Sequence, residues 1–335
     1  MKTAVRLFRY EDALLPNALA WTYMFTAYLF GLTAILADAL WINILGVLFL
    51  AHSMVIAAYF IHECAHDSLF KKNRYNQMFG ELLLWVTGSS YSDYKAVRHK
   101  HVRHHMDRAD IVSFDFRTRL QAYPKVLRFI EILEWFYIPA LEILMHALVI
   151  ILPFVKTNRK HLRSRIIIVL ILRFAFFAYL ASISMKVLVF YPVAYMIFLT
   201  VMRFMDAHQH TYDLHETLDQ KRGCEVKQYD NAFEKRNTYS NIISLKYPWL
   251  NLLVLNFSFH NVHHDQQMQP WYRLPKLHSK LYGKDETQVL SFSNLLKSYH
   301  RYRVARLINS DAVDTDVHKG RDFIGVAGVS LLTAH

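Results

Sequence analysis

Three groups of histidines are the residues of this chain whose types and spacing best fit metal chemistry. Eight of its 19 histidines lie in short groups with repeated spacing, namely His62 and His66, then His101, His104 and His105, and finally His260, His263 and His264. On a helix, residues three or four apart lie on one face, so each group is predicted to converge there and bind metal. Eight imidazoles exceed the roughly four ligands of one zinc ion and fit two metals, with Fe, Cu and Zn as candidates.

Four apolar segments are long enough to place these groups beside a membrane. They run from about residue 18 to 37, 40 to 61, 166 to 184 and 187 to 205, and a helix needs about 20 apolar residues to cross the hydrocarbon. Charged residues are concentrated between the segments, although 53% of the chain is hydrophobic. A pair of metals at the ends of such helices would reach an aliphatic substrate that is dissolved in lipid.

The basic residues indicate on which side of the membrane the histidines lie. Lys2, Arg6 and Arg9 precede the first span, the turn at residues 38–39 has no Lys or Arg, and many follow the second span. Cytoplasmic loops are enriched in Lys and Arg, so the N-terminus and the first two histidine groups are expected in the cytosol. Four spans return the C-terminus to the same side, and the N-terminal segment lacks a cleavage site and is interpreted as a retained cytosolic tail.

The region from about residue 129 to 154 is not predicted to be a simple transmembrane span. Four ionisable residues interrupt its apolar run, and basic residues flank it on both sides: Glu131, Glu134, Glu142 and His146. A single crossing would carry one basic flank to the wrong side of the membrane. We therefore expect one or two interfacial or re-entrant helices along the cytosolic leaflet.

Charge and composition complete the predicted architecture. The formal net charge is +12, and it follows from the basic loops that are expected in the cytosol. It favours a lipid bilayer with anionic headgroups as partner. No nucleic-acid-binding signature is present in the sequence. Cys64 and Cys224 give no disulfide framework and fit a reducing compartment. The expected fold is an all-α integral membrane protein of one domain, residues 1–335, with four transmembrane helices, interfacial helices and a cytosolic cap that carries the histidines.

The complete pattern H-x-x-x-H, H-x-x-H-H, H-x-x-H-H resembles the membrane fatty acid desaturase family. The likeness covers about residues 50 to 285 and includes the residues around the histidines at 62–70, 261–264 and 274–278. It implies that the histidines hold two iron ions and that O2 with two external electrons removes two hydrogens from an acyl chain. His260 stands where the front-end desaturases usually carry Gln. The sequence lacks the His-Pro-Gly-Gly motif of a fused cytochrome b5 domain, so a separate ferredoxin or cytochrome b5-type protein with its reductase is the expected electron donor.

The resemblance also implies one further ligand at the cytosolic end of the fourth span. His208 and His210 are the candidates, and His210 is favoured because it follows Asp206 by four residues, one helical turn. Carboxylates near the histidines could orient the ligand imidazoles, or could be ordinary surface or ion-paired groups. The candidates for this role are Glu63, Asp67, Asp107 and Asp265.

The other histidines are expected to have structural or surface roles. His52 lies inside an apolar span and is interpreted as a hydrogen-bonded core histidine, while His99 points away from the ligand face of its helix. Cys64 is expected to be a small core residue. The remaining histidines are predicted to be at the surface or the membrane interface, and they are His146, His161, His215, His278, His300, His318 and His335.

Other functions compete with the desaturase interpretation. His62-Glu63-x-x-His66 matches the H-E-x-x-H motif of zinc metalloproteases, in which Glu63 would be the general base, but that leaves two histidine groups unused. A metal transporter would place its ligands nearer the middle of the membrane. Lipid hydroxylases, carotenoid ketolases and alkane monooxygenases use similar histidine patterns, and the region around the third group favours an acyl-lipid desaturase among them. The double-bond position and the acyl carrier stay open.

Overall fold

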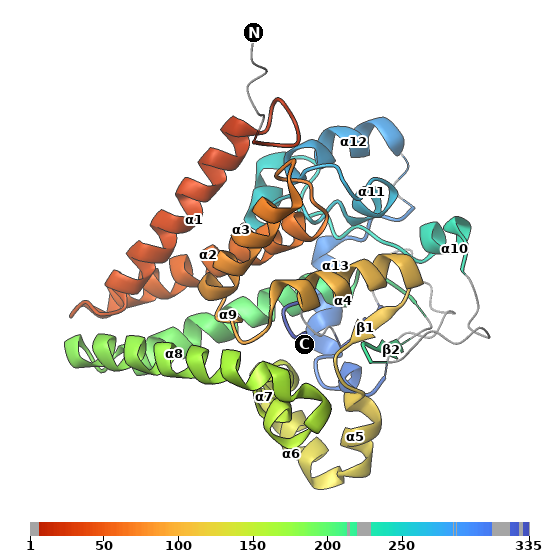
Figure 1. The fold of residues 1–335 in the computed structure, drawn as a ribbon. Helices are drawn as coiled ribbons and strands as arrows, with labels where there is room; N and C mark the ends of the chain where they lie inside the picture. The colour runs from red at the N-terminus through yellow and green to blue at the C-terminus, as the bar shows by residue number, and fades with distance from the viewer. Residues whose placement is uncertain are drawn as a thin grey trace.

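The computed structural model describes residues 7–212, 215–219, 229–283, 285, 287–309, 322–327 and 331–334. The chain is mostly helical, with one two-stranded sheet among the described residues (Figure 1). Cys224, His318 and His335 lie outside the described residues, as does the side chain of His215.

Three helices are long and apolar enough to cross a membrane among the residues that are described. They are α2 (Leu40–Ala65), α8 (Arg163–Ile183), which a 3-10 turn extends back to Thr157, and α9 (Val187–Ala207). The helix α1 (Leu14–Ala34) occupies the predicted first span but does not reach the apolar content of the other three. The chain is therefore a membrane protein with three candidate spans, and the expected first span, at α1, stays a prediction.

Close packing and a capped turn join α1 to α2. A Cβ atom added at Gly31 would lie 2.8 Å from Leu50 Cβ, so the glycine lets the two backbones approach closely. The Asn43 side-chain amide donates to Ala34 O and Ala37 O, at 2.9 and 2.8 Å. These bonds satisfy carbonyl groups that the end of α1 leaves without helical partners.

The helices α3 (Asn73–Val86) and α4 (Tyr94–Asp107) follow α2 and carry the chain across its end. Asp93 caps α4, because its side chain accepts a hydrogen bond of 2.8 Å from Ala96 N. The ring of Tyr94 lies against Gly80 of α3, where a Cβ atom would have no room. The packing holds α4, and the histidines on it, in one orientation against the membrane helices.

The predicted interfacial region, residues 129–154, falls on the two helices α6 (Pro124–Trp135) and α7 (Ala140–Val155), which follow α5 (Phe116–Ala122). Two of the three acids that interrupt its apolar run are buried, since Glu134 is 4% and Glu142 0% exposed. Glu134 pairs with Arg203 of α9 at 2.9 Å. One expectation is wrong: His146 is buried inside the protein and pairs with the Tyr91 hydroxyl, because α7 turns its polar residues inward.

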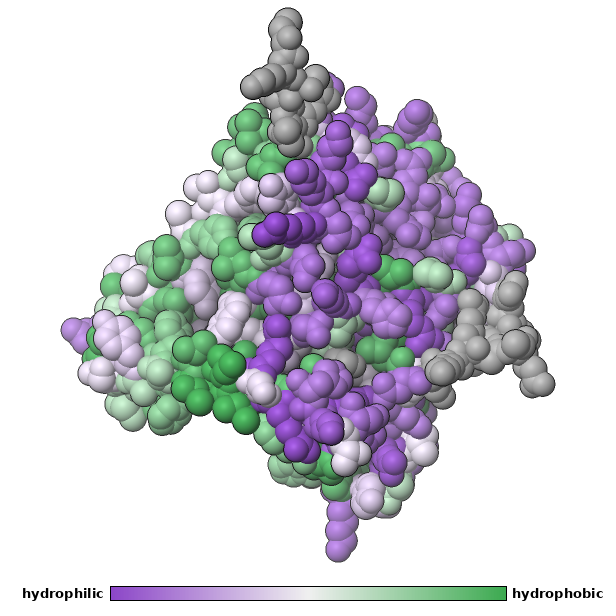
Figure 2. Space-filling view, viewed as in Figure 1, coloured by the Kyte–Doolittle hydropathy of each residue, from purple (hydrophilic) through white to green (hydrophobic). Residues whose placement is uncertain are grey.

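The remaining elements form the polar side of the molecule. The strand β1 (Asp110–Val112) pairs in parallel with β2 (His215–Thr217). The short helices beyond α9 are α10 (Asn231–Arg236), α11 (His260–Asp265), α12 (Leu274–Leu281) and α13 (Phe292–Arg301), and the 3-10 turns are Thr157–Leu162, Pro248–Val254, Trp271–Arg273 and Ala305–Leu307. Figure 2 shows hydrophobic residues gathered on the side of α1 and α8, and hydrophilic residues on the side of α10 to α12.

Candidate metal centre

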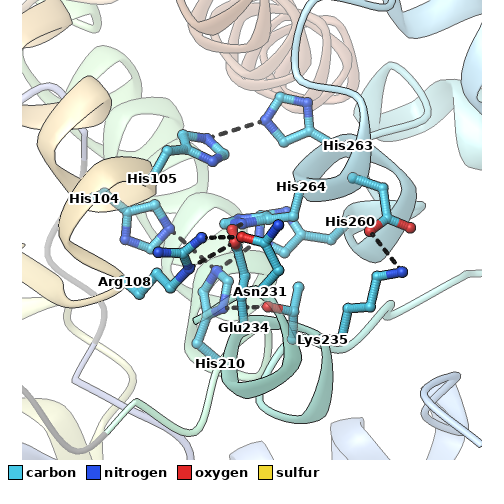
Figure 3. A network of polar contacts seen from close by, with 12 residues as sticks. His104, His105, Arg108, His210, Asn231, Glu234, Lys235, His260, His263 and His264 are labelled. Carbon is cyan, nitrogen blue, oxygen red and sulfur yellow. Dashed lines mark hydrogen bonds and ion pairs between the residues drawn. The ribbon is translucent and has the colours of Figure 1, made fainter. Parts of the chain in front are cut away.

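Nine histidines lie together in two adjacent groups, and they are the nine residues expected from the sequence. The first group, called the five-histidine group, comprises His62, His66, His101, His105 and His263. The second, called the four-histidine group, comprises His104, His210, His260 and His264, and Figure 3 shows it beside His105 and His263. Within each group the candidate ligand atoms lie within 4.8 Å of one another.

Four elements bring these side chains together. The first pair lies at the C-terminal end of α2, where His66 is the residue that follows the helix, and the second histidine triplet lies on α4. His210 follows α9, and the third triplet forms the short helix α11. The polar end of the helix bundle is therefore where all of the candidate ligands meet.

Each histidine triplet is divided between the two groups, contrary to the expectation that it converges on one site. On α4, His101 and His105 belong to the five-histidine group, whereas His104 belongs to the four-histidine group. On α11 the division is reversed, since His263 joins the five-histidine group while His260 and His264 join the other. Adjacent residues of a helix point in directions about 100° apart. Two neighbouring histidines can therefore face two different metal positions.

The distances between ring nitrogens match those expected between ligand atoms of one bound metal. In the five-histidine group, Nε2 of His101 lies 2.6 Å from Nε2 of His66 and 3.1 Å from Nε2 of His105. In the other, Nε2 of His210 lies 3.1 Å from that of His104 and 2.8 Å from that of His260. A neutral imidazole carries a single N–H, whereas metal–nitrogen bonds of about 2.1 Å at right angles place neighbouring ligand atoms about 3 Å apart.

Burial keeps these imidazoles in the form that binds metal. Loss of water contact lowers the pKa of His104 to about 4 and that of His263 to about 3. The pKa values of His101 and His264 are also well below the usual value, because of burial first and neighbouring histidines second. The nitrogens are therefore unprotonated at neutral pH and available as ligands.

Glu234 is a site residue that the sequence did not identify. Its Oε1 lies 2.9 Å from His264 Nδ1, and its Oε2 accepts a hydrogen bond of 2.9 Å from Arg108 Nε (Figure 3). A carboxylate that accepts the Nδ1 proton leaves Nε2 of the imidazole free for the metal, and His264 Nε2 is indeed buried without a partner among the described residues. Glu234 lies 30 residues before His264, so no local spacing could have revealed the contact.

The four carboxylates considered from the sequence form other contacts. Glu63 accepts hydrogen bonds from Ser68 Oγ at 2.7 Å and from Trp271 N at 3.3 Å. The other three bind neighbouring side chains: Asp67 pairs with Arg98 at 3.0 Å, Asp107 pairs with Arg103 at 2.8 Å, and Asp265 accepts a 2.6 Å bond from the Tyr282 hydroxyl. Asp67 and Asp107 are therefore ion-paired groups, one of the two roles considered from the sequence, whereas Glu63 is buried at 1% exposure and hydrogen bonded without an ion pair.

His210, not His208, lies with the other histidines, although the reason differs from the one expected. The helix α9 ends at Ala207, so Asp206 and His210 do not share a helical turn. Instead the residues around His210 bridge to a second segment, with Tyr239 N donating to Gln209 O at 2.8 Å. His208 packs its ring against Phe323, with the ring centroids 5.3 Å apart.

The remaining expectations for single residues are met in part. His52 is hydrogen bonded, with Nε2 at 2.9 Å from Leu253 O, and His99 is exposed on α4. Cys64 is fully buried. The expectation of a surface position is wrong for His278 as it is for His146, because α12 packs its ring beside Phe259.

Two cavities border the histidines on different sides. The inner cavity has a volume of about 130 Å³ and touches histidines of both groups, with apolar residues such as Met202 and Phe257 in its wall. The outer cavity has a volume of about 410 Å³, is polar and touches His105 and His264. The inner cavity can therefore place an apolar molecule beside both candidate metal positions.

The comparisons with known proteins agree with this geometry. The family described as fatty acid desaturase matches residues 39–294, which include all nine histidines. No curated protein matches the chain, and neither does any solved structure.

Proposed function

Because this chain belongs to the fatty acid desaturase family, we propose that it is a di-iron fatty acid desaturase of the membrane. It is an oxidoreductase of the desaturase and hydroxylase type, and the proposal adds the metal, the substrate and the outcome. The substrate is an acyl lipid or acyl-CoA in which two neighbouring methylenes become a cis double bond. The overall change consumes one O2, two electrons and two protons, and releases two waters with the unsaturated chain.

One observation carries the proposal: two histidine groups, with five and four members, border the same inner cavity. Two irons held by these groups would provide the redox chemistry that is needed to oxidise an unactivated C–H bond with O2. Imidazole suits iron as a ligand, and nine ligands are too many for a single ion.

The protein's own residues position the substrate and exclude water. Ala58, Met202 and Phe257 provide apolar surface in the inner cavity on the side of α2 and α9. Val326, Ala327 and Leu331, from the segments 322–327 and 331–334, line another part of the cavity. The apolar part of this wall favours contact with a hydrocarbon chain over contact with water.

We further propose that the histidines and both termini face the cytosol and that a separate protein supplies the electrons. The distribution of Lys and Arg supports this orientation. A ferredoxin or a cytochrome b5-type protein with its reductase is the expected donor.

Expression in a host that lacks desaturases tests the proposal, with mass spectrometry of the total fatty acids as the readout. New monounsaturated chains are expected, and their double-bond position defines the regiochemistry. Replacement of His62, His104 or His263 by Ala should abolish the product, because each change removes an imidazole from one of the two histidine groups. Retained activity in all three variants, or active protein without iron, would overturn the assignment.

Two alternatives predict different products. A lipid hydroxylase or ketolase of the same superfamily would yield oxygenated lipids in the same experiment. A zinc metalloprotease would need Glu63 beside the metal, yet Glu63 is 1% exposed and its carboxylate is bound to Ser68 and Trp271 N. Glu63→Gln with metal analysis separates these functions, because a protease would keep one zinc and lose peptide hydrolysis.

A further inference from the structure

Polar side chains border the inner cavity although a plain methylene chain has no use for them. Tyr59, Gln209 and Asp206 are among the residues that line it, beside histidines of both groups. Tyr59 is 4% exposed and Gln209 is 6% exposed, so bulk water does not reach them freely.

These three polar groups lack hydrogen-bond partners within the part of the chain that the structure describes. The Tyr59 hydroxyl is buried without a partner, and the recorded hydrogen bonds of Gln209 and Asp206 use only their backbone atoms. Lys100 borders the same cavity and behaves differently, because its Nζ donates to Thr333 O and Thr333 Oγ1 at 3.3 Å each. Buried polar groups are nearly always paired, so the unpaired groups of the buried Tyr59 and Gln209, with the half-buried Asp206 beside them, point to a ligand that pairs them.

The charges around the cavity favour a neutral ligand. Asp206 and Lys100 attract each other electrostatically, so the carboxylate already has a nearby positive charge. A second carboxyl, that of Asp110, also borders the cavity and disfavours an anion. A phenol and an amide can each donate and accept, and a carboxylate accepts, which together match an alcohol hydroxyl that does both.

We propose that the inner cavity binds a lipid alcohol, whose hydroxyl group lies within a few bonds of the carbon that loses hydrogen. Tyr59, Asp206 and Gln209 are the hydrogen-bond partners of that hydroxyl. Tyr59 precedes His62 by three residues on α2 and Gln209 directly precedes His210, so the bound hydroxyl lies close to both histidine groups. This inference rests on the proposed function, because it names the substrate class of the same oxidation.

Binding of two probes that differ by one hydroxyl tests the inference on the purified, iron-loaded full chain in detergent. The dissociation constants of 1-hexadecanol and hexadecane are measured by equilibrium dialysis with radiolabelled compounds. The alcohol-to-alkane preference is expected to be about tenfold greater in the wild type than in Tyr59→Phe or Gln209→Leu, with alkane binding unchanged. Comparing preferences between variants cancels the different partitioning of the two probes into micelles.

Gln121→Leu is the matched control, because Gln121 is exposed on α5 and the same side chain is replaced. It should keep the wild-type preference. Iron content is measured for every variant, since Gln209 neighbours His210. If Gln209→Leu loses iron, the result for Tyr59→Phe decides the test. This variant removes a single oxygen atom from a residue in the interior of α2.

An equal preference in the wild type and in Tyr59→Phe overturns the inference and assigns the unpaired groups to bound water. The result is separable from the proposed function. A chain that desaturates plain acyl lipids in the host but shows no alcohol preference contradicts only this inference. A chain that shows the preference but forms no oxidised lipid contradicts only the proposed function.

Discussion

At the scale of single residues, the unequal size of the two histidine groups has a consequence for metal content. His66→Ala leaves the five-histidine group with four imidazoles, whereas His260→Ala leaves the other group with three. We expect His260→Ala to hold about one iron per chain and His66→Ala to hold nearly two, because four imidazoles still complete a site. Metal analysis of purified protein measures the difference, with His99→Ala on the exposed face of α4 as the control. Equal losses in the two histidine variants would contradict the division of the groups.

Glu234 gives a second prediction at this scale, since it fixes the orientation of His264. Glu234→Gln should weaken iron binding about 10- to 100-fold, because an amide holds the Nδ1 proton less strongly than a carboxylate does. Competition with a chelator measures the affinity. Glu131→Gln makes the same replacement on α6, where Glu131 pairs with the exposed Arg128 at 3.1 Å, and should leave iron affinity unchanged. An unchanged affinity in Glu234→Gln would show that His264 is oriented without it.

At the scale of elements, a buried ion pair joins α6 to the membrane helix α9. Arg203 is 3% exposed and binds both oxygens of Glu134, at 2.9 and 3.0 Å. Arg203→Met leaves a buried carboxylate without its cation and should cost about 3–5 kcal/mol of stability. The double variant Arg203→Met with Glu134→Leu should recover most of that loss. Thermal unfolding in detergent compares the two, and a double variant no more stable than the single one would contradict this account.

The elements also show which local patterns were informative. Three of the four expected spans and the histidine spacings were predictable because hydrophobic length and the 3.6-residue period are properties of each segment. The burial of His146 and His278 was not predictable, since the environment of each side chain depends on segments that pack against it from elsewhere in the chain. The position of His210 was inferred for the wrong reason, because the end of α9 at Ala207 is followed by a bridge to residue 238.

At the scale of the whole molecule, the two helical hairpin turns meet at the end opposite the histidines. Lys186, between α8 and α9, donates from Nζ to Ala37 O at 2.8 Å and to Asp38 O at 2.7 Å in the turn after α1. The contact supports the placement of both turns on the same side of the membrane. It also agrees with the proposed topology, in which this end faces away from the cytosol.

Cysteine labelling in oriented vesicles tests that topology. In a Cys224→Ala background, with Cys64 buried, single cysteines replace the exposed residues Asp38, Lys125 and Lys156. Lys125→Cys and Lys156→Cys should react with an impermeant reagent from the cytosolic side, because in the proposed topology neither α6 nor α7 crosses the membrane. Asp38→Cys should react only from the other side. Opposite labelling of Lys125→Cys and Lys156→Cys would mean that the region between them crosses the membrane.

The sequence by itself determined which nine histidines are the candidate ligands, the family, and where the long apolar helices lie. Each of these depends on residue type and on spacing within a short segment, which the chain carries before it folds. Only the tertiary structure decided how the triplets divide between two groups, that Glu234 supports His264, and which polar side chains border the inner cavity. Those features arise where α2, α4, α9 and α11 meet, and contacts between distant segments follow from packing and not from local spacing.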